Sequence, residues 1–232
     1  MGVRQVFVRF AGCNLSCWYC DTPASRVDRP ETCAIQTPPE GSVCRNVPNP
    51  LEVGAVKSFV VDLESSARGH HSVSLTGGEP LEQVDFLKEL CPELRKAGLR
   101  IYLETNGTLP AALKFVLPDV DIVAMDCKLQ SATGAKPDLE IHRAFLEVAA
   151  GAEVFVKAVV ARSTNEREIE DCASVIATVG KAIPLVIQPV TPVVDHIDAP
   201  RGFQLMQFHA AARKYLDDVR VIPQCQRMLG LR

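Results

Sequence analysis

The sequence predicts an α/β protein built on a mostly parallel sheet that curls into a partial or modified (βα) barrel. Three observations predict this fold class. Short apolar runs rich in β-branched residues recur along the chain, segments with helical spacing separate most of them, and polar or glycine-rich motifs follow several runs directly. Strands that alternate with helices favour βα units, whose crossover connections make neighbouring strands parallel.

The first apolar run, QVFVRF, is short enough to be a buried strand, and six similar runs follow it. Helical spacing fills most of the intervals, and Gly151 ends the fourth of the expected helices. The expected strands cover 5–10, 72–76, 100–104, 121–126, 153–160, 183–188 and 219–223, and the expected helices cover 50–66, 81–97, 110–117, 138–150, 164–180 and 201–216. Six or seven such units fit one domain, so residues 1–232 are expected to form a single domain.

The segment at about 24–50 interrupts this alternation because it is rich in proline and polar residues. It lacks the periodic apolar residues needed to bury a core, so we expect a loop or small insert. Cys33 and Cys44 lie in it. An auxiliary iron-sulfur cluster would need about four thiolates, so an exposed loop is the expected role of this insert.

Composition excludes several classes of function. With 232 residues and 47% hydrophobic content the chain can bury a sizeable core, and its net charge of -3 with a pI near 6.0 leaves no basic footprint for nucleic acid. No apolar run is long enough to cross a membrane and the N-terminus lacks the pattern of a secretory signal, so the cytoplasm is the expected location. Nine cysteines without regular spacing indicate cluster chemistry and buried thiols rather than a disulfide framework.

Three cysteines stand close together after the first strand, in RFAGCNLSCWYCDTP. Cys13, Cys17 and Cys20 have the spacing C-x3-C-x2-C. One compact loop with this spacing can bind three corners of an iron-sulfur cube and leave the fourth iron open, as a catalytic metal centre requires. The alternatives are three unrelated cysteines, or a structural or electron-carrying zinc or cluster module, which would leave the motifs after the other strands unexplained.

Those other motifs are GGEP at 77–80, ETNGT at 104–108 and DCK at 126–128. Because each follows or closes an expected strand, they should meet at the carboxyl edge of the sheet, where barrel enzymes build their active sites. The C-x3-C-x2-C spacing after the first strand, Tyr19 before the third cysteine and GGEP after the second strand together resemble the radical S-adenosylmethionine superfamily. That resemblance implies a [4Fe-4S] cluster at Cys13, Cys17 and Cys20, with S-adenosylmethionine on the open iron. Glycine allows close backbone approach, so Gly78 is expected to contact this cofactor.

The longer stretch VFVRFAGCNLSCWYCDT is similar to a narrower group in that superfamily. Those enzymes are carbon-nitrogen lyases that convert 6-carboxy-5,6,7,8-tetrahydropterin to 7-carboxy-7-deazaguanine with loss of ammonia, in deazapurine (queuosine-type) biosynthesis. The resemblance continues in LTGGEP, ETNGT, QPVT at 188–191 and the terminal QCQRMLGLR, where Gln226 replaces a histidine that is common in the group. The group's chains normally begin upstream of Met1, with a further strand and a loop that contributes to the substrate pocket.

The resemblance implies roles for particular residues. A carboxylated pterin needs a cation and polar partners, which Arg9 and Glu104 can supply, and a Mg²⁺ ion bound mostly by water needs few protein ligands, such as Thr22. Cys127 is not expected to bind iron, because a fourth thiolate would fill the site that the cofactor needs. The residues implied for substrate are Arg9, Thr76, Glu104 and the terminal carboxylate of Arg232; those implied for the cofactor are Tyr19, Cys20, Asp21, Gly78, Asp126, Cys127, Lys128, Gln188, Pro189, Val190 and Thr191.

The same resemblance implies an external electron donor such as flavodoxin or ferredoxin, a homodimer, and no direct contact with nucleic acid or membrane. A glycyl-radical-enzyme activase shares the fold and the cofactor and remains an alternative. Those activases typically carry a different pair of residues after the third cysteine, so Asp21 and Thr22 favour a small-molecule substrate.

Overall fold

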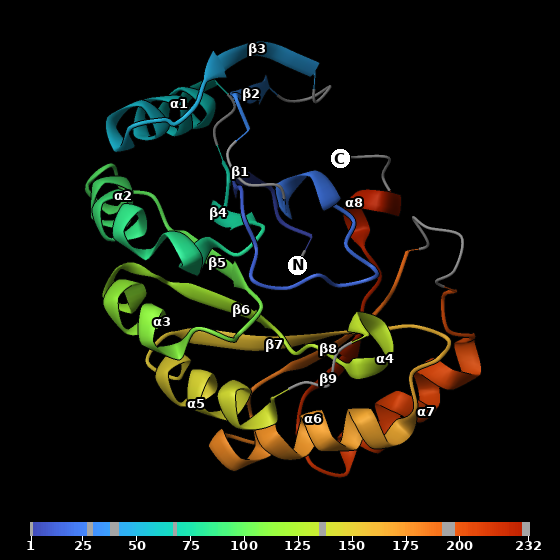
Figure 1. The fold of residues 1–232 in the computed structure, drawn as a ribbon. Coiled ribbons are helices and arrows are strands. Elements are labelled where there is room, and N and C mark those ends of the chain that lie inside the picture. Colours follow the sequence, from blue (N-terminus) through green and yellow to red (C-terminus); the bar gives the residue numbers. More distant parts are fainter. Residues whose placement is uncertain are drawn as a thin grey trace.

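The computed structural model describes residues 2–26, 30–37, 42–66, 69–134, 138–191 and 198–228. A parallel seven-stranded sheet in the order β1-β4-β5-β6-β7-β8-β9 forms its centre (Figure 1). The strands are β1 (Gln5–Phe10), β4 (Ser72–Gly77), β5 (Ile101–Thr105), β6 (Ile122–Asp126), β7 (Glu153–Val160), β8 (Leu185–Pro189) and β9 (Val219–Val221). Within the described ranges β1 and β9 are the two unpaired edges, so the predicted α/β fold is confirmed as an open, partial barrel.

All six expected helices are present, with ends shifted by a few residues. The fifth begins after Asn165 rather than Thr164, because the Asn165 side chain accepts the Glu168 N–H while the Glu168 carboxylate accepts the Asn165 N–H. The expected helices are α1 (Val53–Ser66), α2 (Val84–Lys96), α3 (Pro110–Val116), α5 (Leu139–Ala149), α6 (Glu166–Val179) and α7 (Gly202–Arg213); short additional helices are η1 (Pro23–Arg26), η2 (Pro80–Gln83), η3 (Leu117–Asp119), α4 (Gln130–Thr133) and α8 (Cys225–Met228).

The insert differs from the expected loop. It contains an antiparallel hairpin of β2 (Thr32–Thr37) and β3 (Ser42–Pro48), and the Arg45 guanidinium lies 4.8 Å from the centre of the Phe59 ring on α1. The hairpin was not predicted because prolines and polar residues surround its apolar positions, and its contact with α1 is made through a cation on an aromatic face. The Cys33 thiol is partly exposed, and the Cys44 side chain lies outside the described part of the structure.

Helices cover one face of the sheet and leave the other for polar side chains. In Figure 1, helices α2, α3, α5 and α6 line one side, while the segment after β1 crosses the other side near α4 and α8. Val73, Leu75 and Leu103 belong to the helix-covered core. Since side chains alternate along a strand, Arg9, Thr76 and Glu104 belong to the opposite face.

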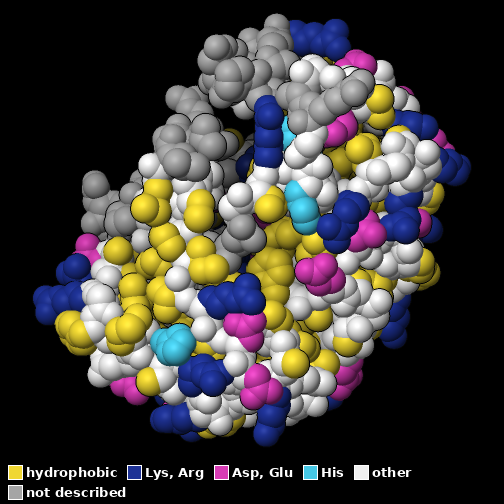
Figure 2. Space-filling model, turned by 180° about the vertical axis from the view of Figure 1, so that it is seen from behind, with side chains coloured by type: hydrophobic (Ala, Val, Ile, Leu, Met, Phe, Trp, Pro, Cys, Tyr) yellow, Lys and Arg dark blue, Asp and Glu magenta, His cyan; other side chains and the backbone are white. Residues whose placement is uncertain are grey.

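Charged side chains of both signs are interspersed over the face seen from behind in Figure 2, with hydrophobic groups between them. This view shows no broad basic area on that face. None of the helices in the described ranges combines the length and the apolar character needed to cross a membrane.

Candidate active site

The three cysteines of the predicted cluster site lie on one loop between β1 and η1, which we call the cluster loop (residues 11–22). The loop is tied down by its backbone. Gly12 N–H donates to the carbonyl oxygen of Ser25 at 2.8 Å, and Glu79 N–H donates to the carbonyl oxygen of Gly12 at 2.8 Å. Cys13, Cys17 and Cys20 are all partly exposed and free of disulfides. The loop therefore presents its thiols at the carboxyl edge of the sheet.

These thiols do not converge on one ion-sized point, since no group of three potential ligands in the described ranges could hold a single metal ion. A cubane cluster makes a different demand, because each cysteine binds a separate iron atom. Burial raises the pKa of Cys13 and of Cys17 above the ordinary thiol value. Metal coordination deprotonates such thiols, so loading the site would release protons.

Two glycines of GGEP let β4 approach the cluster loop closely. A Cβ atom on Gly78 would lie 1.7 Å from the carbonyl oxygen of Gly12, and one on Gly77, at φ +128°, would lie 2.2 Å from the carbonyl oxygen of Phe10. Only glycine fits either position. The backbone of GGEP is thus held directly beside the backbone of the cluster loop, and the contact of Gly78 with the cofactor stays a prediction.

Glu79 is fully buried behind this contact, and its carboxylate joins two loops. Its oxygens accept hydrogen bonds from Leu81 N–H at 3.1 Å, Thr105 Oγ1 at 2.9 Å and Asn106 N–H at 2.7 Å. Burial raises its pKa to about 7, although the three donors partly oppose this. GGEP and ETNGT are therefore held together through one carboxylate.

The polar face of the sheet places Arg9, Thr76 and Glu104 on three adjacent strands. Arg9 is paired in register with Thr76, whose hydroxyl donates to Glu104 Oε2 at 3.2 Å. Ser74 donates to Glu104 Oε1 at 3.3 Å. A carboxylate has further acceptor capacity beyond these two long bonds, so Glu104 can still receive paired N–H groups from a ligand.

The DCK motif forms a charged group beside the cluster loop. Lys128 Nζ lies 2.8 Å from Asp126 Oδ2 and donates to the Tyr19 hydroxyl at 2.7 Å, and Lys157 Nζ lies 3.5 Å from the same Asp126 oxygen. Burial opposes ionisation of Asp126, but the two lysines outweigh it and hold its pKa below the usual value. Asp126 Oδ1 is buried with no hydrogen-bond partner among the described residues. Such an oxygen is an acceptor in need of a donor, which a ligand hydroxyl can provide.

Cys127 points away from this charged group into the core. Its thiol lies 3.8 Å from Nδ1 of His142, and both residues are buried. Interaction with Cys172, together with burial, raises the Cys127 pKa well above its ordinary value. The Cys127 thiol is therefore held within the core, and its exclusion from the cluster stays a prediction.

The segment Gln188–Thr191 closes the opposite side of the site. Gln188 is buried, and Val190 N–H donates to the carbonyl oxygen of Val160 at 2.9 Å. Val190 also forms a small apolar cluster with Val159 and Ala161, against which Tyr19 packs. Tyr19 therefore contacts both predicted cofactor segments, DCK through Lys128 and QPVT through this cluster.

The C-terminal segment reaches the cluster loop through α8. Gln224 Nε2 donates to Asp21 Oδ2 at 3.2 Å, and the Arg227 guanidinium donates to the Asp21 carbonyl oxygen at 3.2 Å. Arg227 also lies 3.7 Å from Asp21 Oδ2. In Thr22, the next residue, the side-chain oxygen Oγ1 accepts a hydrogen bond from the Ser25 hydroxyl at 3.3 Å. Arg232 lies outside the described residues.

Several residues of this site were not singled out by the sequence. Glu79 was part of a quoted motif but had no expected role, and the same holds for Asn106 and Thr108 of ETNGT. Lys157 lies inside an apolar run, EVFVKAVV, where its charge was the available signal. Polar residues within or directly after buried strands thus mark functional positions in this sequence.

Comparison with known proteins identifies the family. A family model for the radical SAM superfamily matches residues 7–175. The 7-carboxy-7-deazaguanine synthase of Geobacter sulfurreducens is 41% identical over 231 residues, covering 99% of this chain and 91% of the relative. That of Methanothermobacter thermautotrophicus is 34% identical over 252 residues, covering 100% and 92%. The chain belongs to the radical SAM superfamily, in the 7-carboxy-7-deazaguanine synthase family.

Solved radical SAM structures share the fold. A radical SAM methyltransferase from Sphaerobacter thermophilus superposes with a TM-score of 0.64 at 15% identity, over 94% of this chain and 65% of that one. Streptococcus suis SuiB bound to S-adenosylmethionine gives a TM-score of 0.62 at 14% identity, over 96% and 47%. This chain thus spans less than two thirds of either protein, and the likeness at such low identity concerns the fold.

The residues present fit the cofactors of a radical SAM protein. Three thiols on one loop match the three cluster ligands. Gly77 and Gly78 place a backbone without side chains beside that loop. Among the described residues Asp126 Oδ1 is a buried acceptor without a hydrogen-bond partner. Radical SAM enzymes combine a [4Fe-4S] cluster with S-adenosylmethionine and draw an electron from an external reductant. The alternatives of a glycyl-radical-enzyme activase and of a simple iron-sulfur module gain no support from these relatives.

Proposed function

We propose that this radical SAM enzyme converts 6-carboxy-5,6,7,8-tetrahydropterin to 7-carboxy-7-deazaguanine with loss of ammonia. The observation that carries the proposal is the face formed by Arg9, Thr76 and Glu104 directly beside the cluster loop. A guanidinium and a carboxylate on adjoining strands can recognise a carboxylate or ring carbonyl and a pterin N–H pair respectively. The similarity to synthases over nearly the whole chain supports the same assignment.

The protein's part in the reaction is to bind, orient and exclude water. When bound, the cluster and S-adenosylmethionine supply a 5'-deoxyadenosyl radical that abstracts a hydrogen atom from substrate. Asp126 Oδ1 would accept from a ribose hydroxyl of that cofactor, and Lys128 would keep Asp126 ionised and hold Tyr19 in place. The backbone beside Gly78 would receive the cofactor's methionine part. Cys20, Asp21, the backbone of Cys127 and the segment Gln188–Thr191 would complete its contacts.

The substrate is proposed to lie against the polar face of the sheet. Glu104 would accept the paired N–H groups of the pterin, with Thr76 fixing the orientation of the carboxylate. Thr22 would contribute its hydroxyl to a Mg²⁺ ion whose other ligands are water and substrate oxygens. The carboxylate of Arg232 would reach the substrate, which is supported by α8 holding the preceding segment against Asp21.

Further properties belong to the same proposal. Residues 1–232 would form one domain that acts as a homodimer in the cytoplasm, reduced by flavodoxin or ferredoxin, without direct contact with nucleic acid. The net charge of -3 supports the last point.

Anaerobic turnover tests the proposal. The protein is reconstituted with iron and sulfide, reduced, and given S-adenosylmethionine, Mg²⁺ and the carboxytetrahydropterin, and the product is identified by mass. We expect 7-carboxy-7-deazaguanine from the wild type and neither product nor 5'-deoxyadenosine from Cys17→Ala. Formation of 5'-deoxyadenosine without the deazapurine would keep the family and refute the substrate. A few residues added after Arg232 should weaken substrate binding, and unchanged affinity would refute the role of the terminal carboxylate.

A further inference from the structure

The cluster loop is joined to the loop after β5 by a closed ring of three side-chain hydrogen bonds. Asn14 Nδ2 donates to Thr108 Oγ1 at 2.9 Å, Thr108 Oγ1 donates to Asn106 Oδ1 at 2.6 Å, and Asn106 Nδ2 donates to Asn14 Oδ1 at 2.7 Å. Each of the three side chains both donates and accepts. The ring therefore fixes the relative position of the two loops more narrowly than a single bond would.

One side of the ring is rigidly supported. Asn106 is buried, its N–H donates to Glu79 Oε2 at 2.7 Å, and its carbonyl oxygen accepts from Nε2 of His142 at 3.3 Å. The Thr108 N–H donates to Asn106 Oδ1 at 3.1 Å. Both backbone polar groups of Asn106, its N–H and its carbonyl oxygen, are therefore hydrogen-bonded independently of the contact between its side chain and Asn14.

The other side of the ring is an exposed part of the cluster loop. Asn14 is exposed and directly follows Cys13. In the described part of the chain, it is the one side chain between Cys13 and Cys17 with a hydrogen bond to a residue beyond the cluster loop. The position of Cys13 therefore depends on Asn14 more than on any neighbouring side chain.

We propose that Asn14, Asn106 and Thr108 form a positioning bracket that sets the geometry of the cluster loop at Cys13. The inference rests on the proposed cluster site and assigns a function to the part of ETNGT that substrate binding leaves unused. The three residues carry no charge and act through the loop, so they are positioning residues rather than catalytic ones. The ring keeps the Cys13 side of the loop in place while the cluster is loaded and reduced.

Substitutions of Thr108 can distinguish loss of the ring hydrogen bonds from a general loss of folding. Thr108→Val keeps the shape of the side chain but removes the hydroxyl that makes two of the three ring bonds. Thr108→Ser retains this hydroxyl and should restore the ring. Thr178→Val is the matched control, because Thr178 is exposed on α6 and its hydroxyl donates to the Val175 carbonyl oxygen at 2.7 Å, remote from the cluster loop in sequence and sheet order.

Two properties of the reconstituted protein are measured in all four proteins, with unfolding of the apoprotein as a check. These are the half-life of bound iron in excess chelator and the electron paramagnetic resonance spectrum of the reduced cluster with S-adenosylmethionine. Loss of two hydrogen bonds should shorten the half-life about tenfold in Thr108→Val and alter the spectrum. Thr108→Ser and Thr178→Val should match the wild type, and the unfolding midpoint of apo Thr108→Val should stay within a few degrees.

The outcomes separate this inference from the proposed reaction. A Thr108→Val protein with the half-life and spectrum of the wild type would overturn the bracket, and so would a Thr108→Ser protein as impaired as Thr108→Val. Iron loss specific to Thr108→Val, in a wild type that forms no deazapurine, would keep the bracket and refute the proposed substrate. Normal product formation, with iron retention in Thr108→Val equal to that of the wild type, would support the proposed substrate and refute the bracket.

Discussion

Glu79 illustrates how one buried side chain can organise a site that it does not itself occupy. Its two oxygens receive three donors from η2 and from the end of β5. The sequence placed Glu79 at the right edge of the sheet but gave no indication of its partners, because Thr105 and Asn106 lie on another strand. A role that depends on contacts between strands cannot be predicted from a sequence pattern. A role that depends on the spacing of ligands within one loop, as from Cys13 to Cys20, can be.

The ionisation of Glu79 predicts a pH dependence of stability. Its folded-state pKa of about 7 lies above the ordinary value of 4.5, so the folded protein binds more protons between these limits and the group's contribution to stability falls as pH rises through that window. Glu79→Gln removes this dependence because glutamine does not titrate. The glutamine N–H₂ group would also replace an oxygen that accepts hydrogen bonds, and so would lie against a donor. We expect the variant to be less stable by about 1–3 kcal/mol at pH 5.

Urea unfolding of both apoproteins at pH 5 and pH 8 measures this effect. The stability difference between wild type and Glu79→Gln should shrink at pH 8 by up to about 3 kcal/mol, the equivalent of the pKa shift. A difference that grows with pH would mean that the three donors keep Glu79 ionised and its pKa low.

Gly78 gives a second prediction at this scale. A methyl group there would lie 1.7 Å from the Gly12 carbonyl oxygen, so Gly78→Ala must displace the cluster loop. We expect a lower unfolding midpoint and loss of S-adenosylmethionine binding, measured by calorimetry on the reconstituted protein. Gly54→Ala on α1 has open space at the same position and should leave both unchanged. Normal cofactor affinity in Gly78→Ala would contradict the close backbone contact.

At the scale of elements, the regular strands and helices were predictable and the short irregular ones were not. Each expected strand is a short apolar run, and each expected helix has apolar residues at helical spacing. Helix α8 is too short for such a pattern, and the apolar residues of β2 and β3 stand among prolines and polar residues, so these elements were found only through their contacts with Asp21 and with α1. Elements that are stabilised mainly by tertiary contacts leave little local pattern to detect.

Helix α8 should couple the C-terminal segment to the cluster loop. Arg227→Met keeps the length of the side chain but removes its bonds to Asp21. We expect KM for the pterin to rise about tenfold, as for loss of one charge-assisted hydrogen bond. Both partners are partly exposed, so the free energy of unfolding should change by less than about 1 kcal/mol. Arg167→Met, which breaks an exposed pair with Asp171 on α6, is the control. An unchanged KM in Arg227→Met would contradict the coupling.

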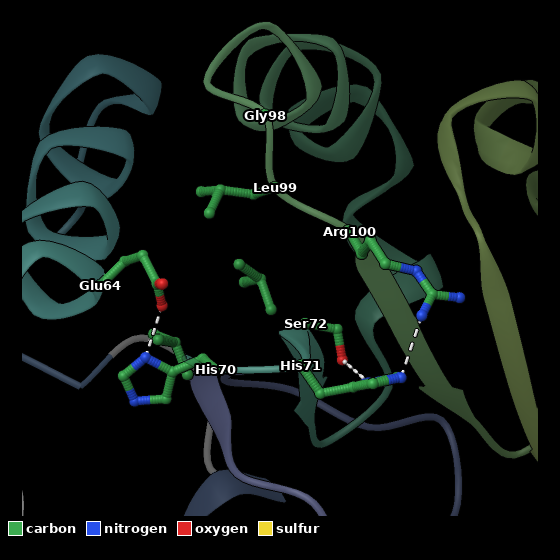
Figure 3. A pocket seen from close by; sticks show the side chains of 9 residues that line it. Glu64, His70, His71, Ser72, Gly98, Leu99 and Arg100 are labelled. Atoms are coloured by element: carbon green, nitrogen blue, oxygen red, sulfur yellow. Dashed lines mark hydrogen bonds and ion pairs between the residues drawn. The ribbon is translucent and has the colours of Figure 1, made fainter. Parts of the chain in front are cut away.

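On the scale of the whole molecule, the two ends of the sheet have different properties. The amino end holds a cavity of about 250 Å³ lined by Glu64, His70, His71, Ser72 and Arg100 among others (Figure 3). Its polar groups are bonded to one another. Arg100 donates to Nε2 of His71 at 3.0 Å, and His70 Nδ1 lies 2.5 Å from Glu64. The carboxyl end, in contrast, carries Asp126 Oδ1, which has no hydrogen-bond partner in the described ranges. A site whose groups already satisfy each other has little to offer a ligand.

This contrast predicts that substitutions at the two ends differ in effect. Glu104→Gln at the carboxyl end should lower kcat/KM about a hundredfold, because two charge-assisted bonds to the pterin would be lost. Arg100→Gln at the amino end removes a half-exposed cation far from the proposed substrate face, so kcat/KM should stay within twofold of the wild type. Steady-state kinetics on equally loaded proteins decides the matter, and a large loss in Arg100→Gln would assign function to the amino-end cavity.

The pairing of β1 with β4 also bears on how the chain can vary without losing the site. Every other neighbouring pair in the sheet is joined by a connection whose regular elements are all helices, whereas residues 11–71 lie between β1 and β4 and include the hairpin and α1. The entropy of closing a loop grows only with the logarithm of its length, by about 0.6 kcal/mol for each doubling. Lengthening or shortening the hairpin is therefore thermodynamically inexpensive. The length of the hairpin can therefore vary while β1 and the three cysteines keep their register.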